Sequence, residues 1–191
     1  MHKHYIIHKP FGYLSQFIAN GKTKSRHKYL GELYDFPDGT MSIGRLDLQS
    51  EGLLFLTTDG QVSHEVRSKK IEKEYYVQLD GEVTNEALEK LQNGVEISTD
   101  SGPYQTLPST AKIIENPNFG TRVGRKVRDD RHGPTTWVSI TINEGKFRQV
   151  RKMTAAVGYP TLRLVRVRIG DILLDGLTLG EVKEVDNLFN A

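Results

Sequence analysis

The sequence predicts an α+β fold, with a mixed, mostly antiparallel sheet flanked by helices. Segments with the pattern of strands outnumber those with the pattern of helices, and the two kinds do not alternate as they would around a parallel sheet. No repeat and no linker rich in Pro, Gly or Ser divides the 191 residues. A chain of this length buries about 70% of its surface on folding. We therefore expect one domain over residues 1–191, built as two lobes.

The expected strands are apolar runs, or segments in which apolar and polar residues alternate. Tyr5 to His8 is such a run, and Lys9-Pro10 should end it because proline lacks the amide donor of a strand ladder. The segment 136–142 alternates strictly, which predicts a strand with one buried and one exposed face. Its inward residues should be Val138, Ile140 and Ile142, and its outward ones Trp137, Ser139 and Thr141. Further strands are expected at 53–58, 73–80, 95–98, around 110–115, and at 161–169 with a bulge near Leu164 to Arg166.

Three segments have the features of helices. Asp59-Gly60 should turn the chain into a short helix through Val62 and Val66. Residues 84–94 should form a second helix, with Thr84 as its N-cap and Gly94 as its end. In the third, at 147–158, the residues at helical spacing that should face the core are Val150, Met153 and Val157, while Arg148, Arg151 and Lys152 fall on a different face.

Composition excludes several classes of protein. The chain contains no cysteine, which removes disulfides, cysteine-ligated metal centres and thiol catalysis. No apolar run approaches the roughly 18 residues of a membrane-spanning helix, and the N-terminus lacks the apolar core of a signal peptide. We therefore expect a cytoplasmic protein whose catalytic nucleophile, where one exists, is oxygen or nitrogen.

Positive charge is concentrated in a few segments. Residues 144–170 hold seven Lys and Arg against one acid, and residues 1–31 hold six against none. The irregular stretch 116–135 contains five more basic residues between 122 and 131, Arg125 and Lys126 among them. Segregated positive charge is typical of a surface that binds a polyanion such as a nucleic acid, although solvated strand and helix faces give the same pattern.

One segment carries a candidate catalytic centre. Arg45, Asp47, Ser50 and Glu51 crowd a loop directly before the most apolar strand of the chain. Charged groups beside a buried element are costly unless they are paired, so Arg45 and Asp47 form either a structural ion pair or part of a site. A carboxylate beside an arginine stays ionised at neutral pH, which suits a nucleophile or a group that stabilises a cationic sugar.

The string GRLDLQSEGLLFLTTDG, at residues 44–60, resembles the GRLD-x-x-SEGLLLLTNDG motif of the small- and large-subunit ribosomal pseudouridine synthases. Three further segments are similar to that family in the same order: HKPFGYL at 8–14, KEYYVQLDG at 73–81, and EGKFRQVRKMTAAVGYPTLRLVRVRIG at 144–170. The chain begins within a few residues of the KP motif, so we expect no S4 RNA-binding module. It is most similar to the E type of the large-subunit enzymes.

The resemblance implies the pseudouridine synthase fold, with an active-site cleft between two lobes. It implies that one uridine of large-subunit (23S) ribosomal RNA is isomerised to pseudouridine without cofactor or metal, by a protein we expect to be a monomer. Asp47 would be the catalytic aspartate, Tyr75 the aromatic that stacks on the target base, and Arg151 the arginine that pairs with Asp47. Tyr76, on the opposite face of its strand, should be a core residue. The residues expected to contact RNA are Arg45, Lys73, Arg148, Lys152, Arg166, Arg125 and Lys126.

Three questions stay open at this point. Asp47 either attacks C1′ of the ribose or removes a ribose proton to give a glycal, and the sequence does not choose between the routes. A catalytically inactive RNA-binding or ribosome-assembly protein is an alternative, which an intact set of Asp47, Tyr75 and Arg151 disfavours. A glycoside hydrolase would need a second carboxylate, for which only Glu51 and Asp59 are close in sequence.

Overall fold

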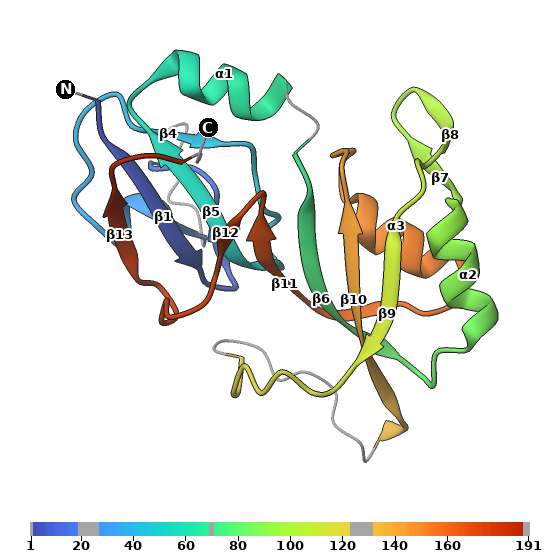
Figure 1. Ribbon diagram of the computed structural model, residues 1–191. Coiled ribbons are helices and arrows are strands. Elements are labelled where there is room, and N and C mark those ends of the chain that lie inside the picture. The colour runs from blue at the N-terminus through green and yellow to red at the C-terminus, as the bar shows by residue number, and fades with distance from the viewer. Residues whose placement is uncertain (1, 19–26, 69–70, 123–131, 189–191) are drawn as a thin grey trace. The chain divides into compact units, whose positions relative to one another are not determined.

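The computed structural model describes residues 2–18, 27–68, 71–122 and 132–188. These form two compact units, one made of Met1–Ile71 with Arg166–Ala191 and the other of Glu72–Val165 (Figure 1). Both units combine strands with helices in no regular alternation, so the predicted α+β class is confirmed. No helix of the described residues is long and apolar enough to cross a bilayer.

The first unit is organised around one fully buried strand. All seven residues of β5 (Glu51–Thr57) are buried, because the apolar run that begins at Leu53 has neighbouring strands on both sides. The strand order is β13-β1-β5-β11, with β4 also paired to β5 and β12 to β11. Helix α1 (Gly60–Ser68) packs along β4 and β5 (Figure 1). The other bounds are β1 His4–Lys9, β4 Met41–Ile43, β12 Ile172–Leu173 and β13 Val182–Val185, and β11 (Thr161–Ile169) contributes residues 166–169.

A small layer of this unit was not predicted from the sequence. Strands β2 (Tyr13–Leu14) and β3 (Lys28–Tyr29) form a short parallel pair, and the 3-10 helix η1 (Leu30–Glu32) follows directly. Two-residue strands leave no periodic pattern that sequence reasoning can use.

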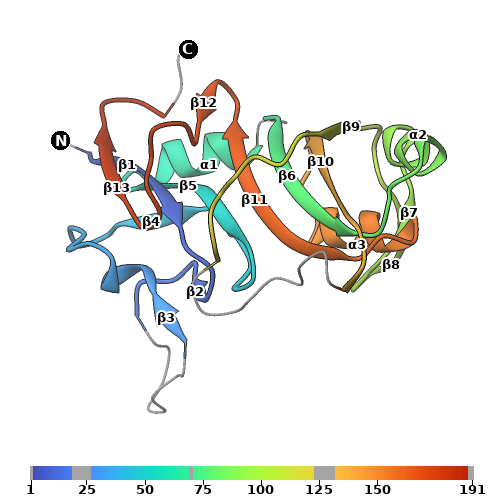
Figure 2. The ribbon, with the colours of Figure 1, turned by 90° about the horizontal axis from the view of Figure 1, so that it is seen from below.

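The second unit is built on an antiparallel pair of long strands, β6 and β10, which are far apart in sequence, with one further strand on each side. Its strand order is β11-β6-β10-β9, and both views show β6 and β10 side by side (Figure 1 and Figure 2). Helix α2 packs beside β9, and α3 packs beside β7. The bounds are β6 Lys73–Asp80, α2 Asn85–Asn93, β7 Glu96–Thr99, β8 Gly102–Gln105, β9 Thr110–Ile114, β10 Thr135–Ile142 and α3 Gln149–Ala156.

The caps predicted for α2 are confirmed. The Thr84 hydroxyl accepts a hydrogen bond from the Ala87 amide at 3.3 Å, which satisfies one donor of the first turn. Gly94 ends the helix at a φ of 90°, a conformation that other residues rarely adopt. Local sequence therefore decides both ends of this helix.

Burial corrects two predictions about the faces of the long strands. Trp137 and Ser139, expected on an exposed face of β10, are buried, because Phe119 packs 5.9 Å from the Trp137 ring and Glu74 accepts a hydrogen bond from Ser139. Tyr76, expected in the core, is half-buried, whereas Tyr75 is 8% exposed. Tyr75 lies opposite Ile140 in the β6–β10 register, so it shares the face that carries the apolar residues.

Two further predictions concern α3 and β11. Val150 and Met153 are buried as predicted, but Val157 is the half-buried C-cap. Arg148, expected on the helix, is instead its N-cap, with φ 54° and ψ 32°. Strand β11 runs through Thr161–Ile169, and its buried residues from Arg163 to Arg166 are consecutive, so both faces are covered there. The bulge near Leu164 to Arg166 stays a prediction.

Candidate active site

Asp47 lies in the loop that joins β4 to β5, within the first unit. Leu46 before it is buried, whereas the Asp47 side chain is half-buried. The Ser50 amide donates a hydrogen bond to the Asp47 carbonyl at 3.0 Å, which closes a turn between the two residues. The carboxylate therefore stands on a tight turn at the entrance to the most buried strand of the unit.

The segment that follows β1 holds this loop on both sides of Asp47. The Ser15 hydroxyl donates to the Leu46 carbonyl at 2.8 Å and accepts from the Leu46 amide at 3.0 Å. The Gly12 amide donates to the Leu48 carbonyl at 2.8 Å. Because the backbone on each side of Asp47 is hydrogen-bonded, the carboxylate is presented from a constrained position. The Gly12 contact joins the segments 8–14 and 44–60 directly in the fold.

A buried lysine also connects the segment after β1 to the loop that bears Asp47. Lys9 is fully buried, and its Nζ donates to the Pro10 and Ser50 carbonyls, each at 2.9 Å. Burial lowers the pKa of Lys9 to about 7, against the opposing influence of the Glu51 and Asp47 carboxylates and together with that of Arg166. Lys9 therefore carries a proton that is only weakly held, next to the loop that bears Asp47.

Arg166 packs against the start of β5. Its Nε donates to the Leu53 carbonyl at 2.7 Å, and the side chain is 4% exposed. Its Nη2 is buried with no hydrogen-bond partner among the described residues. A Cβ on Gly52 would lie 2.2 Å from the Arg166 carbonyl oxygen, so only glycine fits this close approach of two backbones. The Arg166 side chain is therefore buried in the free protein, and its expected contact with RNA stays a prediction.

The second unit carries the other residues expected at the site. Tyr75 and Lys73 are two positions apart on β6, so both lie on the face that includes Val77. Tyr75 is buried and Lys73 half-buried. Arg151, on the first turn of α3, is half-buried, with its Nε enclosed.

The residues expected to contact RNA differ widely in exposure. Arg45 is exposed, and it forms no salt bridge with any of the described residues, so the structural ion pair with Asp47 that the sequence left open does not form. Arg148 and Lys152 are half-buried, and the Lys152 ammonium donates to the Ser98 carbonyl at 2.7 Å. Arg125 and Lys126 lie outside the described residues.

Some of the basic residues counted as surface charge are structural. Arg163 is buried, donates to the Gly120 carbonyl at 2.7 Å and lies 5.6 Å from the Phe119 ring centre. Arg122 is also buried and donates to the Leu162 carbonyl at 3.3 Å. The described part of the stretch 116–135 is therefore anchored to its own unit, which corrects the expectation of a basic loop that begins at Arg122.

Sequence reasoning missed the residues that hold the Asp47 loop. Lys9, Gly12 and Ser15 lie in or next to the quoted segment HKPFGYL, whose resemblance to the family was the only signal available for them. Nothing in composition predicts that a lysine before a proline is buried. In the part of the chain that the structure describes, no group of three or more His, Asp or Glu side chains is placed to hold a metal ion.

A model of the RNA pseudouridylate synthase family matches residues 3–156, which include Asp47, Tyr75 and Arg151. The chain belongs to the RNA pseudouridylate synthase family. Ribosomal large subunit pseudouridine synthase E of Vibrio parahaemolyticus is 41% identical over 184 residues, which cover 94% of this chain and 72% of that protein. The protein of the same name from Xanthomonas axonopodis pv. citri is 42% identical over 175 residues, 90% of this chain and 88% of that protein.

A solved structure agrees with this assignment. The chain is similar to a crystal structure of a pseudouridylate synthase with a TM-score of 0.76 and 27% identity, over 97% of this chain and 70% of that one. The predicted family and fold are thus confirmed, and this RNA pseudouridine synthase is an isomerase. The alternative of an inactive RNA-binding protein is not favoured.

Proposed function

We propose that this pseudouridine synthase converts one uridine of large-subunit (23S) ribosomal RNA to pseudouridine. The support is its similarity to the two synthases E named above, whose names specify the large ribosomal subunit. We further propose that it acts in the cytoplasm as a monomer of one catalytic domain, without a cofactor. The N1–C1′ bond of uridine breaks, the base turns, C5 bonds to C1′, and the C5 proton is released while N1 gains one.

We propose Asp47 as the catalytic aspartate. Both routes left open, attack on C1′ and removal of a ribose proton, require an ionised carboxylate with a fixed position. The hydrogen bonds from Ser15, Gly12 and Ser50 to the backbone of residues 46–48 supply that constraint before RNA binds. A carboxylate held in place loses less entropy on reaching the transition state.

Tyr75 and Arg151 are proposed to act with Asp47. Tyr75, which is 8% exposed, is proposed to provide the aromatic face for the target base, and stacking on such a face contributes roughly 1–3 kcal/mol per base. Arg151 is proposed to pair with the Asp47 carboxylate, as the family resemblance implies. A double-mutant cycle of Asp47→Asn and Arg151→Met on the free energy of unfolding tests this pairing, and a coupling energy near zero would contradict it.

The proposed RNA contacts include four basic residues that are at least partly exposed. Arg45 is exposed, and Lys73, Arg148 and Lys152 are half-buried. Arg125 and Lys126 are proposed on the charge of their segment alone. For Arg166, the burial described above supports a structural role at β5 over a phosphate contact.

The decisive experiment is Asp47→Asn, assayed by tritium release from a large-subunit ribosomal RNA transcript labelled at C5 of uridine. The amide has the size of the carboxylate but provides neither the anionic nucleophile nor the base, so tritium release should fall by more than about a thousandfold. RNA affinity and thermal stability should stay near those of the wild type. Activity within tenfold of the wild type would remove Asp47 from the mechanism.

Asp59→Asn is the matched control. Asp59 Oδ1 accepts from the Gln61 amide at 2.8 Å at the start of α1, and an asparagine side chain keeps such an acceptor. The same chemical change should therefore leave tritium release unaltered. Loss of activity in both variants would point to general disruption of the first unit. A wild-type protein that binds the transcript without releasing tritium would support the RNA-binding alternative.

A further inference from the structure

An exposed aromatic ring stands on the loop between β10 and α3. Phe147 is 63% exposed, although a phenylalanine ring gains free energy by leaving water. It lies five residues after the end of β10 and two before the start of α3, within the second unit. A ring on a loosely held loop is exposed simply for lack of contacts, whereas this loop is hydrogen-bonded at both ends.

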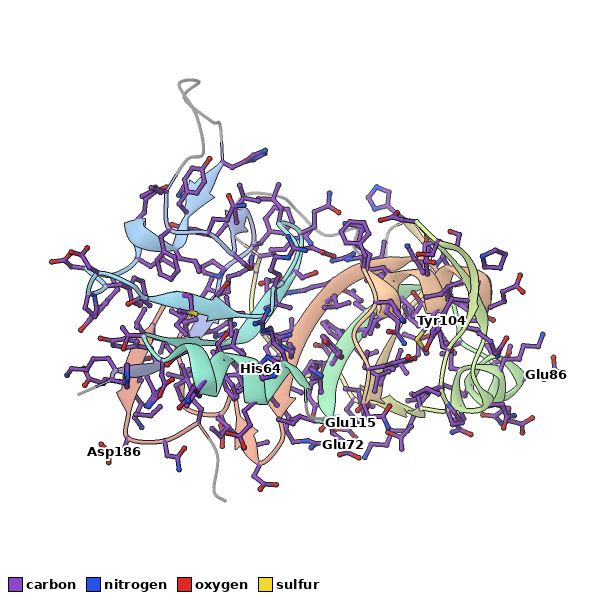
Figure 3. All side chains as sticks on the ribbon, turned by 90° about the horizontal axis from the view of Figure 1, so that it is seen from above. His64, Glu72, Glu86, Tyr104, Glu115 and Asp186 are labelled. Atoms are coloured by element: carbon purple, nitrogen blue, oxygen red, sulfur yellow. The ribbon has the colours of Figure 1, made fainter. Side chains whose placement is uncertain are left out.

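Glu144 fixes the start of the loop to the β7–β8 hairpin. Its Oε2 accepts from the hydroxyl of Tyr104, the β8 residue labelled in Figure 3, at 2.6 Å. Its Oε1 accepts from the Leu107 amide at 2.9 Å and from Gln149 Nε2 at 2.6 Å. Three hydrogen bonds to one carboxylate are charge-assisted and hold the loop against two other elements.

The end of the loop is equally constrained. Gln149 is buried, and its Oε1 accepts from the Lys146 amide at 2.9 Å. Arg148 has a left-handed backbone, which a residue other than glycine adopts only where its surroundings demand it. Phe147 therefore belongs to a loop that is held on one side by Glu144 and on the other by Gln149.

The charges around Phe147 are positive. Residues 144–152 contain four basic residues and one acid, and the acid is Glu144, already engaged in hydrogen bonds. The Lys152 ammonium lies 5.4 Å from the Phe147 ring centre, and the Lys146 ammonium lies 4.3 Å from the Tyr104 ring centre. The Phe147 ring thus stands on a constrained loop with one ammonium group, that of Lys152, close to it.

We propose that Phe147 is a stacking platform for a base of the substrate RNA other than the target uridine. An unpaired nucleotide combines a flat apolar face with a phosphate, and that combination matches an exposed ring that has the Lys152 ammonium 5.4 Å from its centre and Lys146 and Arg148 next to it in sequence. A protein partner that buried the ring would also have to desolvate the Lys152 charge beside it, which makes it the less favourable occupant. The inference rests on the proposed function, because it takes RNA as the substrate.

Two substitutions test the platform. Phe147→Leu keeps an apolar side chain but removes the aromatic face, and it should weaken binding of a large-subunit ribosomal RNA transcript about 5- to 100-fold. In tritium release the same variant should raise KM with kcat unchanged, because the ring acts in binding alone. Phe147→Trp should bind within about twofold of the wild type. Its indole emission should be quenched by RNA, above the constant signal of the buried Trp137.

Leu173→Ala is the control, since Leu173 is also exposed but stands between Asp171 and Asp175. It should leave RNA binding unchanged. Equal RNA binding by Phe147→Leu and the wild type, or no quenching in Phe147→Trp, would overturn the proposal and leave the ring to a protein partner. If the wild type binds the transcript without releasing tritium, the proposed function fails, whereas the binding arm still decides the role of Phe147.

Discussion

Replacing Lys9 with methionine tests whether the amine buried below the Asp47 loop is as weakly basic as its surroundings imply. Burial lowers the pKa of Lys9 from 10.5 to about 7 in the folded protein. The unfolded chain keeps the proton up to its ordinary pKa, so between these two values the unfolded state binds more protons than the folded state. The contribution of Lys9 to the free energy of unfolding therefore rises with pH across this window and is constant below it.

The magnitude follows from one proton. The slope approaches about 1.4 kcal/mol per pH unit, so the wild type should gain about 2 kcal/mol over Lys9→Met between about pH 7 and pH 9. At about pH 9 the neutral amine still donates to the buried Pro10 and Ser50 carbonyls, which methionine leaves without a donor. Each lost partner destabilises by roughly 1–3 kcal/mol, so Lys9→Met should be clearly less stable there.

Urea unfolding followed by circular dichroism at several values from about pH 6 to pH 9 provides the measurement. Urea is uncharged and leaves the electrostatics unscreened. Lys183→Met is the control, because Lys183 is exposed on β13 and its substitution should shift the curve equally at every pH. Parallel curves for Lys9→Met and the wild type, or a wild-type advantage that grows as the pH falls, would refute the reasoning.

Three further predictions follow from burial and contact. Gly52→Ala should unfold the protein at a clearly lower temperature, because its Cβ would meet the Arg166 carbonyl oxygen; an unchanged Tm in a calorimetric scan would contradict this. Arg45→Gln should reduce the log–log salt slope of RNA binding by about 1, whereas Arg166→Gln should lower stability with little change in slope. A smaller salt slope in Arg166→Gln and an unchanged slope in Arg45→Gln would instead assign the phosphate contact to Arg166. Tyr75→Phe should retain RNA affinity, whereas Tyr75→Leu should lower both RNA affinity and turnover. Equal RNA binding by the two variants would mark Tyr75 as a packing residue.

Local pattern was sufficient wherever an element is decided by its own residues. The segment 73–80 was predicted as a strand, and β6 has these bounds. Helix α2 begins after Thr84 and ends at Gly94 because a hydroxyl cap and a left-handed glycine act over only three or four residues. The motif at 44–60 likewise placed Asp47 in a loop before a buried strand without any knowledge of the rest of the fold.

Contacts between segments that are distant in sequence could not be predicted from local pattern. The hydrogen bonds of Ser15 to Leu46 and of Lys9 to Ser50 span 31 and 41 residues of sequence. No periodicity connects such positions, although they decide how firmly the Asp47 loop is held. The left-handed Arg148 is a second case, since its segment has a helical pattern, yet the helix begins one residue later, at Gln149, where the side chain bonds to Glu144.

By itself, the sequence determined the fold class, most elements and the family, because these depend on period, caps and motif. Which charged and aromatic side chains are buried was decided by the tertiary structure alone. Alternation along β6 separates Tyr75 from Tyr76, but the register with Ile140 selects the buried one. Arg45 and Arg166 are the same residue type, yet one is exposed and the other enclosed against Leu53. Burial is set by what covers a side chain, and for these residues the covering groups come from segments far away in the chain.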